Sequence, residues 1–158
     1  MKRADITVPV QIADYAELSA DDKALIDAAR QATYRSYAPY SRFCVGAAIL
    51  LSNGEIVTGS NQENAAYPSG TCAERTAAFY AHSAYPDASF QAIAIAARDT
   101  SGAFTPTATA PCGACRQVLL EYETLAGSDV RVILAAEKEI VILPSVKSTL
   151  PLAFSEFS

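Results

Sequence analysis

The sequence predicts an α/β fold, a three-layer α/β/α sandwich around one mixed sheet of mostly five strands. Helical and strand patterns follow one another in the order α-β-β-α-β-α-β-β, which is typical of one sheet between layers of helices. The strand segments are largely apolar or small, as expected for strands that are covered on both faces. A chain of 158 residues is long enough for one domain with a sizeable core. We therefore expect a single domain over residues 1–158.

The first helix is predicted to begin at Ser19, whose hydroxyl suits an N-cap, with Asp22 three residues later in the capping-box position. It runs to about Ser36 and stops before Pro39, because proline cannot continue a helix. Its core-facing side carries Leu25, Ile26, Ala29 and Ala32. Residues 1–18 form an extra N-terminal segment that we expect to contribute an edge strand. Its alternating apolar side chains are Ile6, Val8, Val10 and Ile12.

Two strands, Cys44–Leu51 and 55–60, are predicted on either side of Asn53-Gly54, a dipeptide that favours a tight hairpin turn. A loop then leads to Thr71, the expected N-cap of the second helix. The remaining elements are a helix over 72–83, a strand over 91–98, a helix over 112–122 that follows Pro111, and strands over 130–135 and 139–143.

The charge balance bears on the class of partner. Lys and Arg number 12 and Asp and Glu number 17, which gives a net charge of −5. Such a chain lacks the basic surface that binds a phosphate backbone, so we expect no nucleic-acid partner. No run approaches the roughly 18 apolar residues of a membrane span, so we expect no membrane partner. The first residues lack the apolar centre of a signal peptide, so we expect a cytoplasmic protein.

Three of the four cysteines lie at the starts of predicted helices, where they are suited to bind a metal. Cys72 opens the second helix, and Cys112 and Cys115 open the third. A helix N-terminus stabilises thiolates through its free N–H groups and partial positive charge. Three thiolates that converge from two helix ends would bind Zn²⁺ and leave a fourth position open for water. The remaining cysteine, Cys44, lies in an apolar run and is interpreted as a buried core residue.

Two other interpretations of these cysteines remain at this point. The C-x-x-C pair alone is also compatible with a thioredoxin-like redox site. A structural zinc site requires a fourth ligand, for which the sequence offers Cys44 and its single histidine, His82. His82 lies about three turns beyond Cys72 on the same helix, too far to share its metal, so we expect it to be packed or solvated. The deciding residue is Glu74, a carboxylate two positions after Cys72.

Cys72-Ala73-Glu74 together with Pro111-Cys112-Gly113-Ala114-Cys115 matches the motif pair of zinc-dependent nucleobase deaminases. The sequence resembles the cytidine deaminase family from about Ala38 to Phe154. The segments that carry this resemblance are APYSRF at 38–43, VGAA at 45–48, NQENAAYP at 61–68, TCAERTA at 71–77 and PCGACRQVL at 111–119. Cysteine at position 72 resembles the small homotetrameric branch, whose single zinc per chain is held by three thiolates.

The resemblance also implies substrate contacts. It implies that the nucleoside is bound by Phe43, Asn61, Glu63 and Ala73, and that Tyr67 and Phe154 complete the site of a neighbouring subunit. In the family, the Asn and Glu of this motif hydrogen-bond the ribose. Without the motif, Asn61 would be interpreted as a turn residue and Glu63 as a surface charge. Phe43 and Phe154 would be interpreted as core residues.

The chemistry follows from Glu74 and its neighbour. A carboxylate beside a metal ligand can reach both a water and a bound base, so Glu74 is expected to carry protons between them. Arg75 is expected to hydrogen-bond the ligand thiolates and offset their charge, although a surface arginine is the alternative. The predicted reaction is the hydrolytic deamination of cytidine and 2′-deoxycytidine in pyrimidine salvage. The alternatives are a deaminase of another aminopyrimidine nucleoside such as blasticidin S, a non-catalytic zinc module, and a polynucleotide-editing enzyme.

Overall fold

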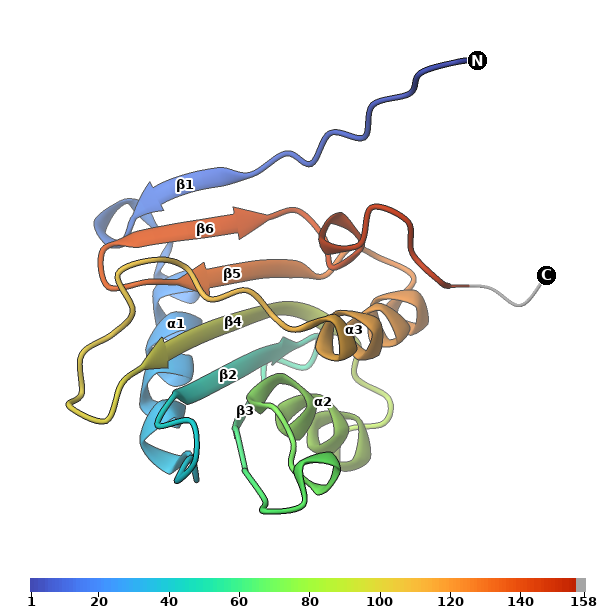
Figure 1. Ribbon diagram of the computed structural model, residues 1–158. Coiled ribbons are helices and arrows are strands. Elements are labelled where there is room, and N and C mark those ends of the chain that lie inside the picture. Colours follow the sequence, from blue (N-terminus) through green and yellow to red (C-terminus); the bar gives the residue numbers. More distant parts are fainter. Residues whose placement is uncertain (156–158) are drawn as a thin grey trace.

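The computed structural model describes residues 1–155, which form one mixed six-stranded sheet in the order β1-β6-β5-β4-β2-β3 (Figure 1). The strands are β1 (Gln11–Asp14), β2 (Cys44–Leu51), β3 (Ile56–Ser60), β4 (Phe90–Arg98), β5 (Arg131–Ala135) and β6 (Glu139–Leu143). β4 and β5 run parallel, and the other neighbouring pairs are antiparallel. The predicted mixed sheet is confirmed, with one strand more than the main five because β1 adds an edge.

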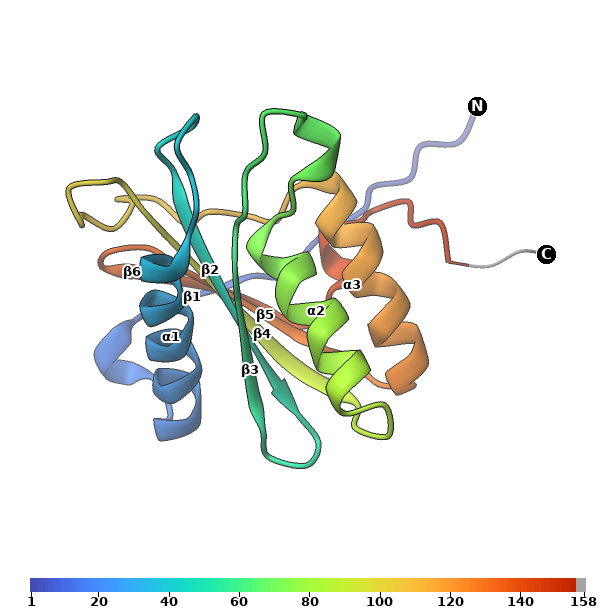
Figure 2. The same ribbon diagram turned by 90° about the horizontal axis from the view of Figure 1, so that it is seen from below.

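Helices cover both faces of the sheet. α1 (Ala20–Ala32) lies on one face, and α2 (Ala73–Ala84) and α3 (Gly113–Ala126) lie side by side on the other (Figure 2). Each face has its own apolar core. One contains Leu25 and Ile26 of α1, and the other contains Ile49 of β2 and Leu119 of α3. The predicted three-layer α/β/α sandwich is therefore confirmed. Within residues 1–155, no helix combines the length and apolar character that crossing a membrane requires.

The predicted N-terminal strand forms over only part of its apolar alternation. β1 pairs with β6, with Ile12 opposite Val141, whereas residues 1–10 lie outside the sheet. The ladder stops here because Gln11 already lies opposite Ile142, next to the end of β6, and Pro144 follows that end. Proline has no N–H to donate to a sheet, and Pro9 interrupts the other side in the same way.

The start of α1 differs in one respect from the prediction. Ser19 Oγ accepts a hydrogen bond from the Asp22 backbone N–H at 3.1 Å, as expected of an N-cap. The Asp22 carboxylate does not close a capping box; it pairs with Arg131 of β5 at 2.6 Å. Burial of this charge is better offset by a guanidinium than by a backbone N–H, so the ion pair takes the carboxylate. The helix ends at Ala32 and continues as one 3₁₀ turn, Thr33–Arg35.

Gly59 of β3 brings the first turns of α2 against the sheet. A Cβ at this position would lie 2.4 Å from the Ala77 backbone N and 2.5 Å from the Ala73 backbone O. Such distances are well inside van der Waals contact, so only glycine allows this approach. The start of α2, which carries Cys72 and Glu74, is thus fixed directly on the edge of the sheet.

Candidate metal centre and active site

The three predicted metal ligands lie together at the N-termini of α2 and α3. Cys72 is the N-cap of α2, in place of the predicted Thr71, and Cys112 is the N-cap of α3. The Sγ atoms of Cys72 and Cys112 are 3.8 Å apart, and those of Cys112 and Cys115 are 3.4 Å apart. All three sulfurs lie within 4.8 Å of one another, and all three thiols are free.

This donor set fits zinc. Sulfurs bound tetrahedrally at the usual Zn–S length of ~2.3 Å lie about 3.8 Å apart, close to the observed separations. Hydrogen bonds from the Cys115 thiol and from Arg75 lower the pKa of Cys72 to about 5. The bond to Cys72, together with burial, raises the pKa of Cys115. One thiol of the cluster is therefore poised as a thiolate before any metal binds.

The two residues considered as a fourth ligand lie elsewhere. Cys44 is buried at the start of β2, as predicted. His82 is exposed near the end of α2, and its ring centroid lies 5.3 Å from that of Tyr122. In the chain from residue 1 to 155, the group that is close enough to hold a metal consists of the three cysteines alone. Three protein ligands are the arrangement of a zinc site that keeps one position open.

Glu74 lies next to this cluster, in the first turn of α2, where its carboxyl interacts with Cys72 and Cys115. Its side chain is only 4% exposed, an unusual position for a carboxylate. Burial raises the pKa of its carboxyl above the usual range, and the neighbouring Cys72 adds to the rise. A carboxyl with a raised pKa holds a proton more readily than a solvated one, which suits a group that takes up and releases protons.

Arg75 contacts the cluster from the same helical turn. Its Nη2 donates to Cys72 Sγ at 3.8 Å, and its Nε is buried without a hydrogen-bond partner in the described residues. The guanidinium thus lies beside the thiols, on a partly buried side chain that also lines the neighbouring cavity. The side chain is in position to offset negative charge on the sulfurs.

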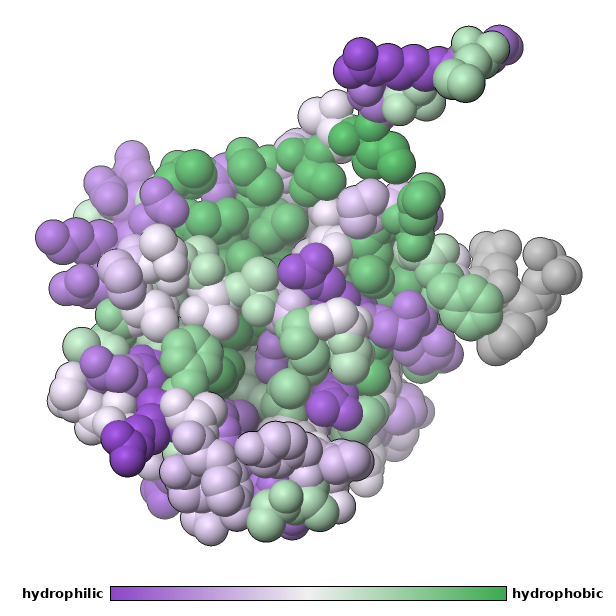
Figure 3. All heavy atoms as spheres, in the orientation of Figure 1, coloured by the Kyte–Doolittle hydropathy of each residue, from purple (hydrophilic) through white to green (hydrophobic). Residues whose placement is uncertain are grey.

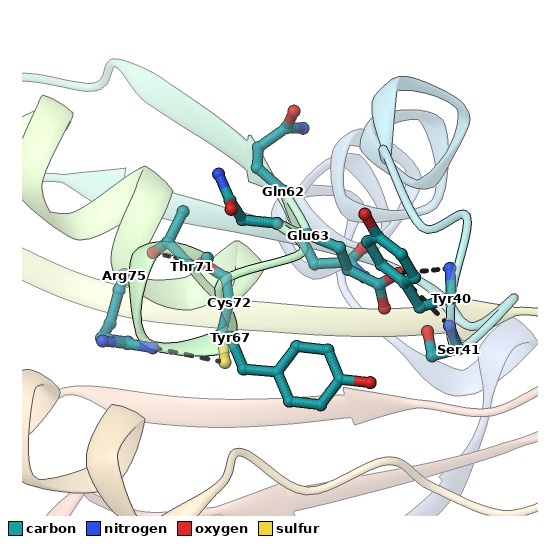
Figure 4. A pocket seen from close by; sticks show the side chains of 11 residues that line it. Tyr40, Ser41, Gln62, Glu63, Tyr67, Thr71, Cys72 and Arg75 are labelled. Atoms are coloured by element: carbon teal, nitrogen blue, oxygen red, sulfur yellow. Dashed lines mark hydrogen bonds between the residues drawn. The ribbon is translucent and has the colours of Figure 1, made fainter.

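A cavity of about 490 Å³ opens beside Cys72 (Figure 4). Its lining residues are Tyr40, Ser41, Asn61, Gln62, Glu63, Asn64, Tyr67, Gly70, Thr71, Cys72 and Arg75. Such a volume lies within the range of pockets that bind small molecules. The predicted substrate residues Asn61, Glu63 and Tyr67 all belong to this lining.

The Asn61 side chain, directly after β3, hydrogen-bonds the backbone at the start of β2. Its Oδ1 accepts the Val45 backbone N–H at 2.8 Å, and its Nδ2 donates to the Phe43 carbonyl at 2.9 Å. The side chain therefore does more than occupy a turn, because it fixes the backbone that carries Phe43. Sequence reasoning did not find this contact, since Asn61 and Val45 are 16 residues apart.

Glu63 holds the next stretch of the same loop. Its Oε2 accepts the backbone N–H groups of Tyr40 at 2.9 Å and Ser41 at 3.2 Å, as Figure 4 shows. Hydrogen bonds from Ser41 and from these backbone groups lower the pKa of Glu63. Tyr40 in turn meets the Tyr67 ring edge-on, with centroids 6.3 Å apart. The interpretation of Glu63 as a solvated surface charge is therefore incomplete.

The other predicted substrate residues lie outside this lining. Ala73 is fully buried as the first residue of α2. Phe43 and Phe154 are both exposed, so their interpretation as core residues is wrong. The Phe154 carbonyl accepts a hydrogen bond from Gln117 of α3 at 2.8 Å. Sequence reasoning did not single out Tyr40, Ser41 and Gln62, although the motifs at 38–43 and 61–68 contain them.

Comparison with known proteins identifies the family of this chain. The model of the cytidine and deoxycytidylate deaminase zinc-binding region matches residues 19–126, which include all three cysteines and Glu74. The chain belongs to this deaminase family. Its family resemblance and its zinc cofactor, both predicted from sequence, are confirmed.

Relatives of known sequence agree with this deaminase assignment over most of the chain. The cytidine deaminase of Halalkalibacterium halodurans is 42% identical over 135 residues, which cover 85% of this chain and 95% of that protein. The cytidine deaminase of Sporosarcina psychrophila is also 42% identical, over 86% of this chain and 93% of that protein.

Solved deaminase structures share the fold. The cytidine deaminase of Burkholderia pseudomallei superimposes with a TM-score of 0.70 at 39% identity, over 83% of this chain and 97% of that one. The enzyme from Mycobacterium tuberculosis gives a TM-score of 0.66 at 36% identity, over 87% of this chain and 100% of that one. The deaminase fold predicted from the motifs is thus confirmed.

Proposed function

We propose that this deaminase hydrolyses cytidine and 2′-deoxycytidine to uridine and 2′-deoxyuridine, with release of ammonia. The observation that carries the proposal is the buried carboxyl of Glu74 beside three converging cysteine thiols, next to a cavity that could hold a nucleoside. The cytidine deaminases that are 42% identical to the chain support the same reaction. In this proposal the whole chain forms one catalytic domain.

Cys72, Cys112 and Cys115 would hold one zinc ion per chain. When bound, zinc supplies the Lewis acidity that makes a water molecule nucleophilic at neutral pH. Three thiolates outweigh a divalent cation, since +2 and −3 leave −1 at a site with three sulfur ligands. Arg75 offsets part of this charge through its bond to Cys72, and the two helix N-termini offset more.

Glu74 carries the protons of the reaction. It takes a proton from the attacking water and delivers it to N3 of the base, while the water oxygen bonds to C4. It then takes the proton of the new hydroxyl at C4 and passes it to the amino group, so that the C4–N bond breaks and ammonia leaves. The oxygen remains on C4 as the carbonyl of uridine. Water, nucleoside, uridine and ammonia therefore balance, and the carboxyl of Glu74 returns to its starting state.

The sugar is bound by Asn61 and Glu63, and the base is bordered by Phe43 and Ala73. The backbone N–H groups of Tyr40 and Ser41 both bond to Oε2 of Glu63, so a ribose hydroxyl would bond to Oε1. Asn61 and Glu63 also hold the loop that carries Phe43. Substrate binding and loop position are therefore coupled.

The proposal includes a homotetramer in which sites are shared. Phe154 is exposed in the single chain, as expected of a side chain that completes a neighbour's site. Tyr67 is exposed too and lines the cavity of its own chain, so in the tetramer it would border both sites. Apolar surface also lies over β1 and β6 in Figure 3, where Val10 and Ile12 are exposed. A cytoplasmic location and a role in pyrimidine salvage belong to the same proposal. The thiol ligands require a reducing compartment.

The test of this function separates the sugar from the reacting base. Because Glu63 binds ribose in the proposal, Glu63→Ala should lower kcat/KM for cytidine about 10- to 100-fold, the loss expected for a hydrogen bond to a charged group. Turnover of free cytosine, which is slow in the wild type, should change far less. The measurement is ammonia release from both compounds.

Glu63→Gln serves as the matched control, because it keeps an oxygen that can accept the Tyr40 and Ser41 N–H groups. Its loss should be smaller than that of Glu63→Ala. An equal proportional loss on cytidine and cytosine would show that Glu63 acts only through the loop and not through the ribose.

A further inference from the structure

The chain after β6 forms an arm, residues 144–154, that runs along α3 and ends with exposed apolar side chains. Leu150 and Ala153 pack against the core. Leu152 and Phe154 are 89% and 62% exposed. Two exposed apolar side chains within three residues, on an arm that side chains of α3 hold in place, offer an apolar surface for contact with another molecule.

α3 holds the backbone of this arm with side chains at three points. Glu123 accepts the Val146 N–H at 2.6 Å and the Lys147 N–H at 2.9 Å. Arg116 donates to the Thr149 carbonyl at 2.9 Å. Gln117 donates to the carbonyl of Phe154 itself at 2.8 Å.

The three residues of α3 that contact the arm are spaced to follow its backbone. Arg116 and Glu123 are seven residues apart, which places them on one face two turns from each other. Gln117 is the neighbour of Arg116 and extends the same row of polar contacts along the arm. The bonds are made to backbone atoms, so they fix the path of the arm independently of its side chains.

We propose that Gln117 is a positioning residue that fixes the end of the arm, so that Phe154 enters the active site of a neighbouring subunit. This inference rests on the proposed function, in which Phe154 completes that site. Gln117 acts through Phe154 and touches no substrate. Its effect is therefore exerted in trans, on the catalytic centre of the partner chain.

Of the three α3 residues that hold the arm, Gln117 is the best one to substitute, because the other two have further structural contacts. Arg116 also holds the carbonyl of Pro111, next to the metal ligand Cys112, at 2.8 Å. Glu123 is buried and also accepts the Val130 N–H, so its loss would destabilise the fold. Gln117→Met keeps the length of the side chain and removes the donor.

The first experiment measures activity and arm order in Gln117→Met. Loss of one hydrogen bond should lower kcat/KM for cytidine about 2- to 10-fold, with zinc content unchanged. The chain contains no tryptophan, so Phe154→Trp introduces a single fluorescent reporter at the end of the arm. In that background, Gln117→Met should lower the fluorescence anisotropy of the reporter. Gln31→Met, the same change at an exposed position of α1, should alter neither quantity.

The second experiment tests whether the effect crosses the subunit boundary. Gln117→Met chains are mixed with inactive Glu74→Gln chains under conditions of subunit exchange. In a hybrid, the catalytic site of a Gln117→Met chain has an intact Glu74. The arm that completes this site comes from a neighbouring Glu74→Gln chain, whose Gln117 is intact. The kcat/KM of each intact site should therefore rise to the wild-type value. Hybrids that stay at the Gln117→Met value would overturn the inference.

A third variant separates this inference from the proposed function. Phe154→Ala should be impaired, and adding Gln117→Met to it should cause little further loss, because both act through one side chain. Wild-type activity in Phe154→Ala would overturn the shared site itself. An impaired Phe154→Ala beside a fully active Gln117→Met with an unchanged reporter would overturn the role of Gln117 alone.

Discussion

Glu74→Gln is expected to lower kcat for cytidine by at least about 10²–10⁴-fold, the usual contribution of general acid–base catalysis. Glutamine has the shape of glutamate and fits the same buried position, which is only 4% exposed. It cannot take up and release a proton at neutral pH. The variant should therefore bind zinc and nucleoside as the wild type does, and fail in the chemical step.

The measurement pairs steady-state kinetics with elemental analysis and calorimetric titration of the product uridine. Bound zinc and uridine affinity within about twofold of wild type would show that the site is intact. A variant that turns over cytidine at nearly the wild-type rate would remove Glu74 from the mechanism. The neighbouring Thr76→Ser provides a control, since it changes the same helical turn but keeps the hydroxyl that donates to the Cys72 carbonyl.

Cys115→Ser is the second change with a large expected effect. Its Sγ is fully buried within the cluster, 3.4 Å from that of Cys112. A neutral hydroxyl is a poor zinc ligand compared with a thiolate, so one ligand is lost. We expect zinc content to fall from about one per chain to near zero after dialysis against a weak chelator, with activity lost in parallel.

Cys44→Ser is the matched control for that result. Cys44 is also buried, but it lies at the start of β2, away from the other three thiols. The variant should keep its zinc and its turnover per zinc ion, although it will be less stable because a hydroxyl is placed in an apolar site. Full zinc in Cys115→Ser would mean that the ligand set is wrong.

The sequence was most informative where one physical rule decides the structure. β2 was predicted with both of its bounds, because an apolar run is followed by the turn dipeptide Asn53-Gly54. The starts of α2 and α3 were predicted within one residue. The prediction of the outer part of the N-terminal strand was wrong, because alternation alone does not reveal that the partner strand ends at Leu143.

The metal centre could be predicted because its ligands lie in two short motifs, and each motif also forms the N-terminus of a helix. The cavity was harder to predict, since its walls depend on contacts between distant segments. Glu63 meets the Tyr40 N–H 23 residues away, and Gln117 meets the Phe154 carbonyl 37 residues away. Side-chain bonds to backbone atoms leave little trace in the sequence, because almost any residue can supply the backbone partner.

The central claim is that zinc held by three cysteines drives hydrolysis of a cytidine amino group. It is tested most directly by adding zinc in steps to metal-free protein, prepared under reducing conditions, while ammonia release from cytidine is recorded. The account predicts that activity rises in proportion to bound zinc and reaches its plateau at one ion per chain. Protein that carries one zinc ion per chain and releases no ammonia from cytidine would contradict it, as would full activity in the metal-free chain.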